Sequence, residues 1–191
     1  MAPRLIPTPG QTVGPFFALG LDRPEWADMT RNNPAGQRIV ITGRVVDGDG
    51  APVPDAVIEL WQANAAGRYD HAEDAQAEKT IDPNFHGYGR VATDAEGRFQ
   101  IKTIKPGPVP GRGNTLQAPH ISIAFFARGL LRQLHTRIYF SDEPGNASDP
   151  LLAGIDDESV RRTLIARRGD GDAYRFDFVL QGEGETAFLD I

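Results

Sequence analysis

The segment from Gly43 to Tyr69 constrains the fold of this chain more than any other part of its sequence. Residues 43–46 and 57–61 are two short runs in which β-branched, aliphatic or aromatic side chains recur. Between them, DGDG at residues 47–50 supplies side chains that tolerate the positive φ angles of a tight turn. The pattern predicts a β-hairpin and a buried strand within an all-β fold.

Composition limits the class of protein before any site is considered. The chain has 191 residues and a net charge of -6, with acidic and basic residues mixed along it, so we expect one globular domain and no nucleic-acid partner. Cysteine is absent, which excludes a disulfide framework and a thiolate nucleophile and favours a reducing, cytoplasmic compartment. Because no apolar run reaches the length of a membrane span, no membrane association is expected.

The chain divides into an N-terminal arm and a β-domain. Residues 1–36 are rich in proline, glycine and asparagine, and their hydrophobic side chains follow no sustained period. We expect this arm to dock on a partner subunit, with packing on its own domain as an equal alternative. Residues 37–191 predict an antiparallel β-sandwich with one short helix within residues 156–168. The expected strands are 38–46, 56–62, 88–93, 98–104, 119–128, 134–140 and 173–180.

Alternation is clearest in the strand that follows Pro119. Ile121, Ile123 and Phe125 share one face, which we expect to join the core, because successive side chains of a strand point to opposite sides. The other face mixes polar and apolar side chains, a composition that suits either solvent or the wall of a site.

Individual residues predict little chemistry by themselves. The four histidines, at positions 71, 86, 120 and 135, have no H-x-H or H-E-x-x-H spacing, so spacing alone indicates no metal cluster. Tyr69 follows a Gly-Arg pair in a loop, where a deprotonated phenol would be a hard ligand for a ferric ion. No serine lies in a G-x-S-x-G elbow and no phosphate-binding loop occurs, which excludes the common hydrolase and nucleotide-binding classes.

Five motifs, in the same order along the chain, resemble the intradiol ring-cleavage dioxygenases, and most closely the alpha chains of their heteromeric members. They are TPGQTVGPF at 8–16, ELWQAN at 59–64, TIKPG at 103–107, APHI at 118–121 and QGEGET at 181–186. The resemblance implies a β-sandwich enzyme built from alpha and beta chains. In such an enzyme a non-haem Fe(III) activates a bound catechol for attack by O2, and the ring opens between its two hydroxyl groups.

The resemblance also implies that the metal site of this chain is vestigial. The iron-bearing beta chains hold the metal with two tyrosines and two histidines. Tyr69 and His120 match the first of each pair, whereas Val109 and Ser122 replace the second. Valine has no donor atom and a serine hydroxyl is too short and weak to replace an imidazole. We therefore expect no metal and no catalytic residue in this chain alone, with the Fe(III) bound by a beta subunit.

Other departures accompany the lost ligands. The beta chains carry arginine at the position of Gln117 and glutamine at the position of Arg137. In the alpha chains the arm lines the partner's site, so the resemblance implies the same contribution here from Thr12, Gly14, Pro15, Phe16 and Arg128. Arg128 is the candidate for holding a substrate carboxylate, because a guanidinium pairs bidentately with such a group.

The function that the resemblance implies is that of a non-metal alpha subunit. It would help its partner cleave protocatechuate with O2 to give 3-carboxy-cis,cis-muconate. Residues 43–60 also resemble carboxypeptidase-regulatory and transthyretin-like modules, so a non-catalytic binding module is the first alternative. A catalytic dioxygenase with unusual metal ligands is the second.

Overall fold

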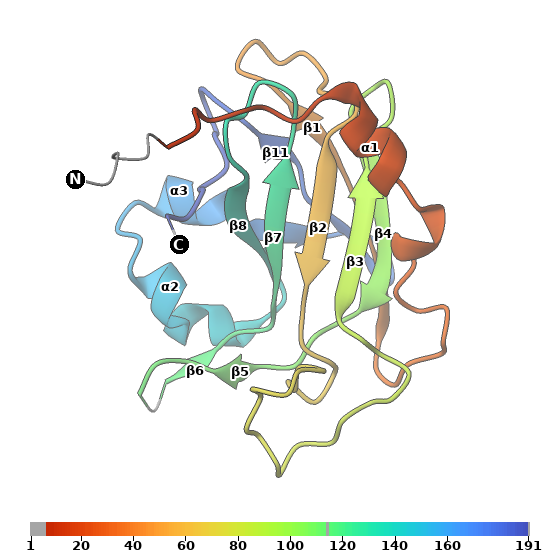
Figure 1. Cartoon of the computed structure of the whole chain (residues 1–191). Coiled ribbons are helices and arrows are strands. Elements are labelled where there is room, and N and C mark those ends of the chain that lie inside the picture. The colour runs from red at the N-terminus through yellow and green to blue at the C-terminus, as the bar shows by residue number, and fades with distance from the viewer. Residues whose placement is uncertain (1–6, 114, 191) are drawn as a thin grey trace, which may run out of the picture.

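Two layers of strands form the domain, and a computed structural model describes them over residues 7–113 and 115–190 (Figure 1). The first layer is antiparallel, in the order β3-β2-β7-β8. It consists of β2 (Val57–Trp61), β3 (Tyr88–Ala92), β7 (His120–Phe126) and β8 (Leu134–Phe140).

The second layer is built around the longest strand, β1. Strand β4 pairs with one edge of β1, and the short strands β10 and β11 follow each other along its other edge. Strand β9 pairs with both β8 and β10 and so joins the layers into one partly barrel-like sheet. The bounds are β1 (Arg38–Val46), β4 (Arg98–Ile104), β9 (Ile165–Arg168), β10 (Ala173–Arg175) and β11 (Phe178–Val179).

The sheet is only partly antiparallel, which corrects the expected architecture. Strand β1 runs parallel to β10 and to β11, and β8 runs parallel to β9. The parallel pair β8 and β9 arises because the connection between them crosses over through helical turns instead of reversing in a hairpin. The mostly β fold and its sandwich-like layers are confirmed.

The predicted hairpin between β1 and β2 is wrong. Residues 45–53 do form a small turn, in which Val53 N donates to Val45 O at 3.0 Å and Asp47 N donates to Ala51 O at 2.9 Å. Beyond it, Pro54 and the positive φ of 59° at Asp55 redirect the chain. As a result β2 enters the other layer, where it pairs with β3 and β7.

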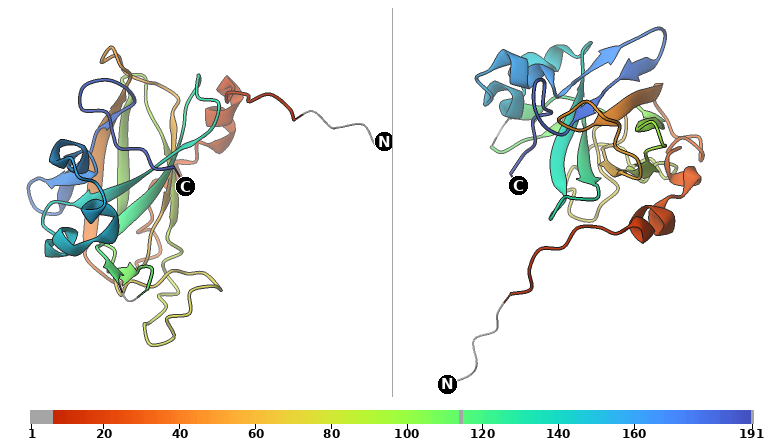
Figure 2. Two further views of the ribbon diagram at one scale, coloured as in Figure 1. Left: turned by 90° about the vertical axis from the view of Figure 1, so that its left-hand side faces the viewer. Right: turned by 90° about the horizontal axis from the view of Figure 1, so that it is seen from above.

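Short helices are more numerous than predicted. The expected helix at 156–168 is limited to α3 (Glu158–Arg162), and the rest of that segment includes β9. The other described elements are α1 (Pro15–Leu21), α2 (Pro150–Ala153), the 3-10 turns η1 (Pro24–Trp26) and η2 (Pro144–Ser148), and the two-residue strands β5 (Val109–Pro110) and β6 (Leu116–Gln117). Figure 2 shows α1 on the opposite side of the sheets from α2 and α3. No described helix is long and apolar enough to cross a membrane.

The space between the layers is filled by aliphatic and aromatic side chains. As predicted, Ile121, Ile123 and Phe125 point into this core. A cluster of phenylalanines with ring centroids 4.9–5.6 Å apart packs at one end of it: Phe99, Phe125, Phe176 and Phe178. Pairs with this separation add favourable ring–ring geometry to the free energy of burial.

The described part of the arm packs on its own domain. Residues 27–29 lie along β4, where Lys102 N donates to Ala27 O and Met29 N donates to Lys102 O. Further towards the N-terminus, the ring of Phe17 lies 5.2 Å from that of Phe126 in β7. These residues therefore contact their own domain, docking of the arm on a partner subunit stays a prediction, and residues 1–6 of the predicted arm lie outside the described part.

Candidate functional site

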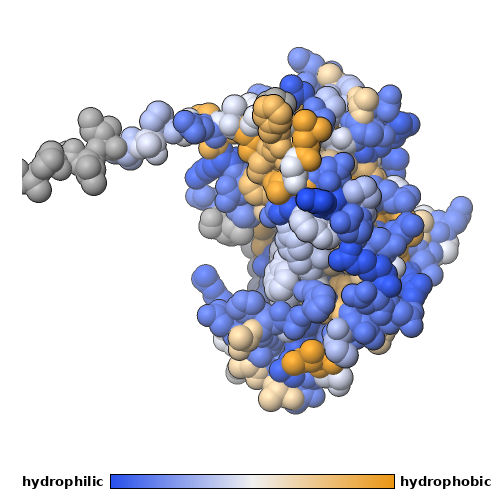
Figure 3. All heavy atoms as spheres, turned by 45° about the vertical axis from the view of Figure 1, so that its right-hand side comes forward, coloured by the Kyte–Doolittle hydropathy of each residue, from blue (hydrophilic) through white to orange (hydrophobic). Residues whose placement is uncertain are grey.

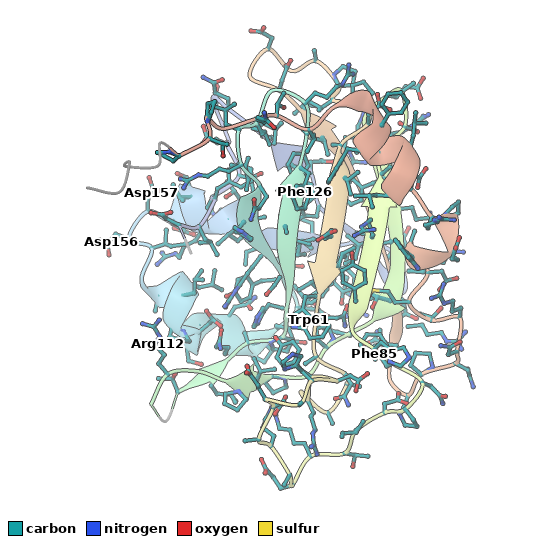
Figure 4. The ribbon with its side chains drawn as sticks, viewed as in Figure 1. Trp61, Phe85, Arg112, Phe126, Asp156 and Asp157 are labelled. Atoms are coloured by element: carbon teal, nitrogen blue, oxygen red, sulfur yellow. The ribbon has the colours of Figure 1, made fainter. Side chains whose placement is uncertain are left out.

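The outer face of β2, β7 and β8 carries the positions singled out from the sequence. Trp61 is the register partner of Ser122, and Ser122 is the register partner of Arg137, so the three residues form a row across three strands. Two register pairs along, His120 is paired with Tyr139. Figure 4 shows Trp61 at the lower end of β2 and Phe126 at the upper end of β7. The face predicted to be solvent or a site wall thus lines a cavity of about 280 Å³ that includes all three residues of this row.

His120 is buried behind this face and is held as a neutral ring. Its Nδ1 donates to Ala118 O at 2.8 Å, and its ring lies 5.5 Å from that of Tyr139. Burial, and then the positive charge of Arg137, lower the pKa of His120 from 6.5 to about 4. A neutral imidazole with Nδ1 protonated leaves Nε2 as the free acceptor.

The start of β7 is fixed by the buried carboxylate of Asp149. Its Oδ2 accepts from Ala118 N at 2.8 Å, and its Oδ1 accepts from Leu151 N at 2.9 Å, from Leu152 N at 3.0 Å and from the hydroxyl of Tyr139 at 3.1 Å. The first turn of α2 and the segment before His120 are therefore held by one side chain. The Asp149 carboxylate accepts all four of these hydrogen bonds from within the protein, so it is not available to bind a ligand.

Tyr69 lies in the loop that follows β2, beside Trp61. Its ring stacks on the indole with centroids 5.6 Å apart and an interplanar angle of 13°. Burial raises the pKa of the Tyr69 phenol, which keeps it protonated near neutral pH. Tyr69 and Val109 line a second and larger cavity of about 660 Å³, in the loop region next to β5.

Arg137 places a positive charge among the four vestigial positions. Its Nη1 donates to Gln117 Oε1 at 2.6 Å and to the hydroxyl of Tyr139 at 3.2 Å. The same charge acts to lower the pKa values of Tyr69, His120 and Tyr139, so the guanidinium is close to all three. The two departures noted at Gln117 and Arg137 are therefore one feature, a directly hydrogen-bonded pair.

The residues at the four positions do not fit an iron ion. Within residues 7–113 and 115–190, no group of three or more His, Cys, Asp or Glu side chains is arranged to hold a metal. Val109 offers no donor, the short hydroxyl of Ser122 is a weak ligand, and the Arg137 cation would repel a ferric ion. No step of chemistry is therefore assigned to a metal in this chain.

The buried, neutral His120 predicts a pH dependence of stability. Its folded-state pKa of about 4 is below the unfolded value of 6.5, so the unfolded state binds more protons between these values and stability falls as the pH falls from 6.5 to 4. The shift corresponds to roughly 3 kcal/mol of free energy of unfolding. The charged and titratable groups that influence the ring are Arg137 and Asp149, and Tyr139 packs against it.

Urea denaturation of the wild type and of His120→Gln at pH 7 and pH 4.5 measures this contribution. The wild type is expected to lose more stability than the variant between the two pH values, by an amount of that order. Equal losses would show that His120 is not held neutral by the fold.

The residues assigned to a partner's site gather at the opposite end of the same face. Gly129 N donates to Thr12 Oγ1 at 2.7 Å, which ties the arm to the strand end that carries Arg128. Gly14 is the N-cap of α1 and Pro15 is its first residue. Phe16 is 81% exposed and Leu19 is 75% exposed. Figure 3 shows exposed hydrophobic atoms gathered in the upper part of the molecule, where α1 lies.

Sequence reasoning missed the side chains that hold the predicted site residues in place. Asp149 lies in a loop that carries no recognisable motif, and neither its burial nor its four partners can be read from spacing. Gln117 and Arg137 were both noted as departures implied by the resemblance, and this joint change was the available signal that they touch. The larger cavity beside Tyr69 depends on the loop at residues 69–78, which has no regular strand or helix.

Comparisons with known proteins cover nearly the whole chain. A family model described as "Dioxygenase" matches residues 14–182. The chain is 41% identical, over 97% of its length and 98% of the relative's, to the protocatechuate 3,4-dioxygenase alpha chain of Pseudomonas putida. It is also 43% identical to the protocatechuate 3,4-dioxygenase beta chain of Burkholderia cepacia, over 83% of this chain and 73% of that one.

A solved structure agrees with the sequence relatives. The dioxygenase domain of a dioxygenase carbohydrate-binding protein fusion from Streptomyces sp. SirexAA-E superposes with a TM-score of 0.62 and 28% identity, over 87% of this chain and 89% of that chain. Because the matches extend far beyond residues 43–60, they do not favour the isolated binding module that this segment also resembles.

Proposed function

Because the chain belongs to the intradiol ring-cleavage dioxygenase family, we propose that it is the metal-free alpha subunit of a heteromeric protocatechuate 3,4-dioxygenase. Enzymes of this family generally depend on iron. Its beta subunit binds the Fe(III), and the assembled enzyme uses O2 to open protocatechuate to 3-carboxy-cis,cis-muconate. The cytoplasmic location expected from the cysteine-free sequence stays a prediction.

The observation that carries this proposal is the composition of the former metal site. A chain that matches an alpha chain over 97% of its length has Val109 and Ser122 where two ligands would be, with the cation of Arg137 among them. When bound in the partner, iron supplies the activation of the catechol towards O2. This chain's own contribution is to bind and orient the substrate at the partner's site.

The arm is placed to make that contribution. Its hydrogen bond from Gly129 N to Thr12 Oγ1 holds the segment before α1 beside Arg128. Phe16 and Leu19, three residues apart in α1, are both largely exposed, and exposed apolar side chains that lie together indicate an interaction surface. A subunit interface at this end would bury Phe16 and bring Thr12, Gly14 and Arg128 to the partner's pocket.

The proposal is tested by iron content and protocatechuate-dependent O2 uptake. The chain is purified alone and after co-expression with a protocatechuate 3,4-dioxygenase beta chain. Iron and turnover are expected only in the co-expressed complex. Stoichiometric iron and turnover in the chain alone would support the alternative of unusual metal ligands. Failure to assemble or to react in either preparation would favour a binding module.

Arg128 is expected to contribute to substrate affinity more than to turnover. Its Nη2 is 3.5 Å from Asp55 Oδ2 and both side chains are more than half exposed, so this ion pair contributes little and can be exchanged for a substrate carboxylate. In the complex, Arg128→Ala should raise KM for protocatechuate by about tenfold, the loss of a charge-assisted contact, with a much smaller effect for catechol.

Arg162→Ala is the matched control, because Arg162 is also exposed and paired, with Glu158. Steady-state O2 uptake with both substrates measures the difference. Equal increases in KM for protocatechuate and catechol would remove the role assigned to Arg128.

A further inference from the structure

The cavity next to Ser122 has the features of a binding site, and side chains have not filled it. Its volume of about 280 Å³ is just below the range of typical ligand pockets, roughly 300–1,000 Å³. The walls are largely apolar and include Trp61, Ala124, Leu151 and Leu189. Such a space accommodates a single ring.

Arg137 is the cation of this cavity and makes no direct ion pair with a described residue; it reaches the carboxylate of Asp149 only through the hydroxyl of Tyr139. The residue is half-buried, and within the described residues its guanidinium forms no ion pair. Its two hydrogen-bond acceptors, Gln117 and Tyr139, are uncharged. A partly desolvated cation without a carboxylate partner favours an anion as ligand.

The donors needed to recognise such an anion remain free. The hydrogen bonds that Arg137 makes to described residues all leave from Nη1, so Nε and Nη2 keep their N–H groups for another partner. These two groups lie on adjacent nitrogens and match the two oxygens of a carboxylate. The hydroxyl of Ser122, the register partner of Arg137, likewise makes no hydrogen bond to a described residue.

One acidic residue, Glu59, lines the cavity, and its charge is balanced by an ion pair with Arg90. Glu59 Oε1 accepts from Arg90 Nη2 at 2.5 Å, from Arg90 Nε at 3.0 Å and from the hydroxyl of Tyr88 at 3.1 Å. Its charge is therefore balanced by Arg90, whereas that of Arg137 is not. The net preference of the cavity is for a monoanion.

We propose that this cavity is a second, non-catalytic ligand site that binds a one-ring aromatic carboxylate. The carboxylate pairs with Nε and Nη2 of Arg137 and accepts from Ser122, while the ring lies against Trp61 and the leucines. The replacement of a metal-ligand histidine by Ser122 leaves the space for the ligand, and Arg137 supplies the positive charge. The site belongs to this chain alone and does not depend on the proposed function.

The test is a titration of the full-length chain, purified by itself, with benzoate and with benzamide, its uncharged counterpart. Binding is followed by calorimetry and by the fluorescence of Trp61, in a Trp26→Phe background because the chain has two tryptophans. Saturable binding of benzoate is expected, with benzamide at least tenfold weaker. Equal affinities, or no saturation by benzoate at millimolar concentrations, would overturn the proposal.

Two variants act on the site through different atoms. Arg137→Met removes the charge but keeps a long side chain, and Ser122→Leu fills the cavity without touching the guanidinium. Each should weaken benzoate binding at least tenfold. Arg167→Met, the same change at an exposed arginine of β9, should leave binding unchanged. Circular dichroism checks that each variant is folded, and folded variants of both kinds with wild-type affinity would contradict the proposal.

The intact complex separates this site from the partner's catalytic pocket. With both chains present, two benzoate molecules are expected per pair of subunits, and one in the Arg137→Met complex. A stoichiometry of one in both complexes would mean that benzoate occupies only the partner's site. The number of bound benzoate molecules does not depend on turnover. Failure of the proposed function would be detected separately, by iron content and O2 uptake.

Discussion

Alanine at position 43 is expected to prevent or severely weaken folding of this chain. A Cβ atom on Gly43 would lie 1.6 Å from the carbonyl oxygen of Phe176 and 2.8 Å from the ring of Phe99. The backbone of Phe176 cannot withdraw, because its N–H donates to Thr42 O at 3.0 Å and the residue connects β10 to β11. We expect Gly43→Ala to lower the free energy of unfolding by about 3–5 kcal/mol.

Urea or thermal denaturation, followed by circular dichroism, measures this change. Gly20→Ala is the matched control, because a Cβ at that position in α1 meets no atom within 4 Å. Its stability should stay within about 1 kcal/mol of the wild type or rise slightly, since alanine favours helix. If Gly43→Ala unfolded at the wild-type midpoint, the close crossing of β1 by Phe176 would be wrong.

The strands were largely predictable because each has a local signature. The predicted bounds 38–46, 98–104 and 134–140 coincide with β1, β4 and β8. The predicted strand at 173–180 is interrupted between β10 and β11, where the chain crosses Gly43. That crossing depends on two segments more than 130 residues apart, so no local pattern reports it.

The strand pairing was the main failure of the sequence interpretation. DGDG at residues 47–50 is a genuine turn, but a turn determines only the direction of the next few residues. The partner of β1 is decided by the seven-residue register with β4, from Arg38 paired with Ile104 to Arg44 paired with Arg98. The hydrogen bonds of this seven-pair register stabilise the pairing of β1 with β4 more than the few hydrogen bonds across the turn could stabilise a pairing of β1 with β2.

The candidate site was predictable as a set of positions but not as a geometry. The family resemblance predicted four vestigial ligand positions, yet Tyr69 and Val109 line one cavity and Ser122 lines another. The division arises because Trp61 lies between them and stacks on Tyr69. Arg137 makes no direct ion pair among the described residues and reaches Asp149 only through the Tyr139 hydroxyl, which only the three-dimensional arrangement reveals.

Removal of residues 1–16 is expected to lower kcat/KM of the assembled enzyme for protocatechuate by at least about 10²-fold. The deletion takes away Thr12, Gly14, Pro15 and Phe16, which we propose to line the partner's pocket. A pocket that loses one wall admits water and holds its substrate less accurately, and small displacements of a reacting group have effects of this size. We expect the iron to stay bound, because in the proposed assembly its ligands belong to the partner.

The deletion should be well tolerated by the chain's own fold. Phe17, which packs on Phe126, and Ala18, which is buried, are kept, whereas Phe16 is largely exposed. Iron content, subunit stoichiometry and O2 uptake are compared with those of a shorter deletion of residues 1–7, which retains the pocket residues and should keep activity within about threefold. Full activity after removal of residues 1–16 would show that the arm completes no catalytic pocket. Loss of the partner from the complex would instead place its main role in assembly.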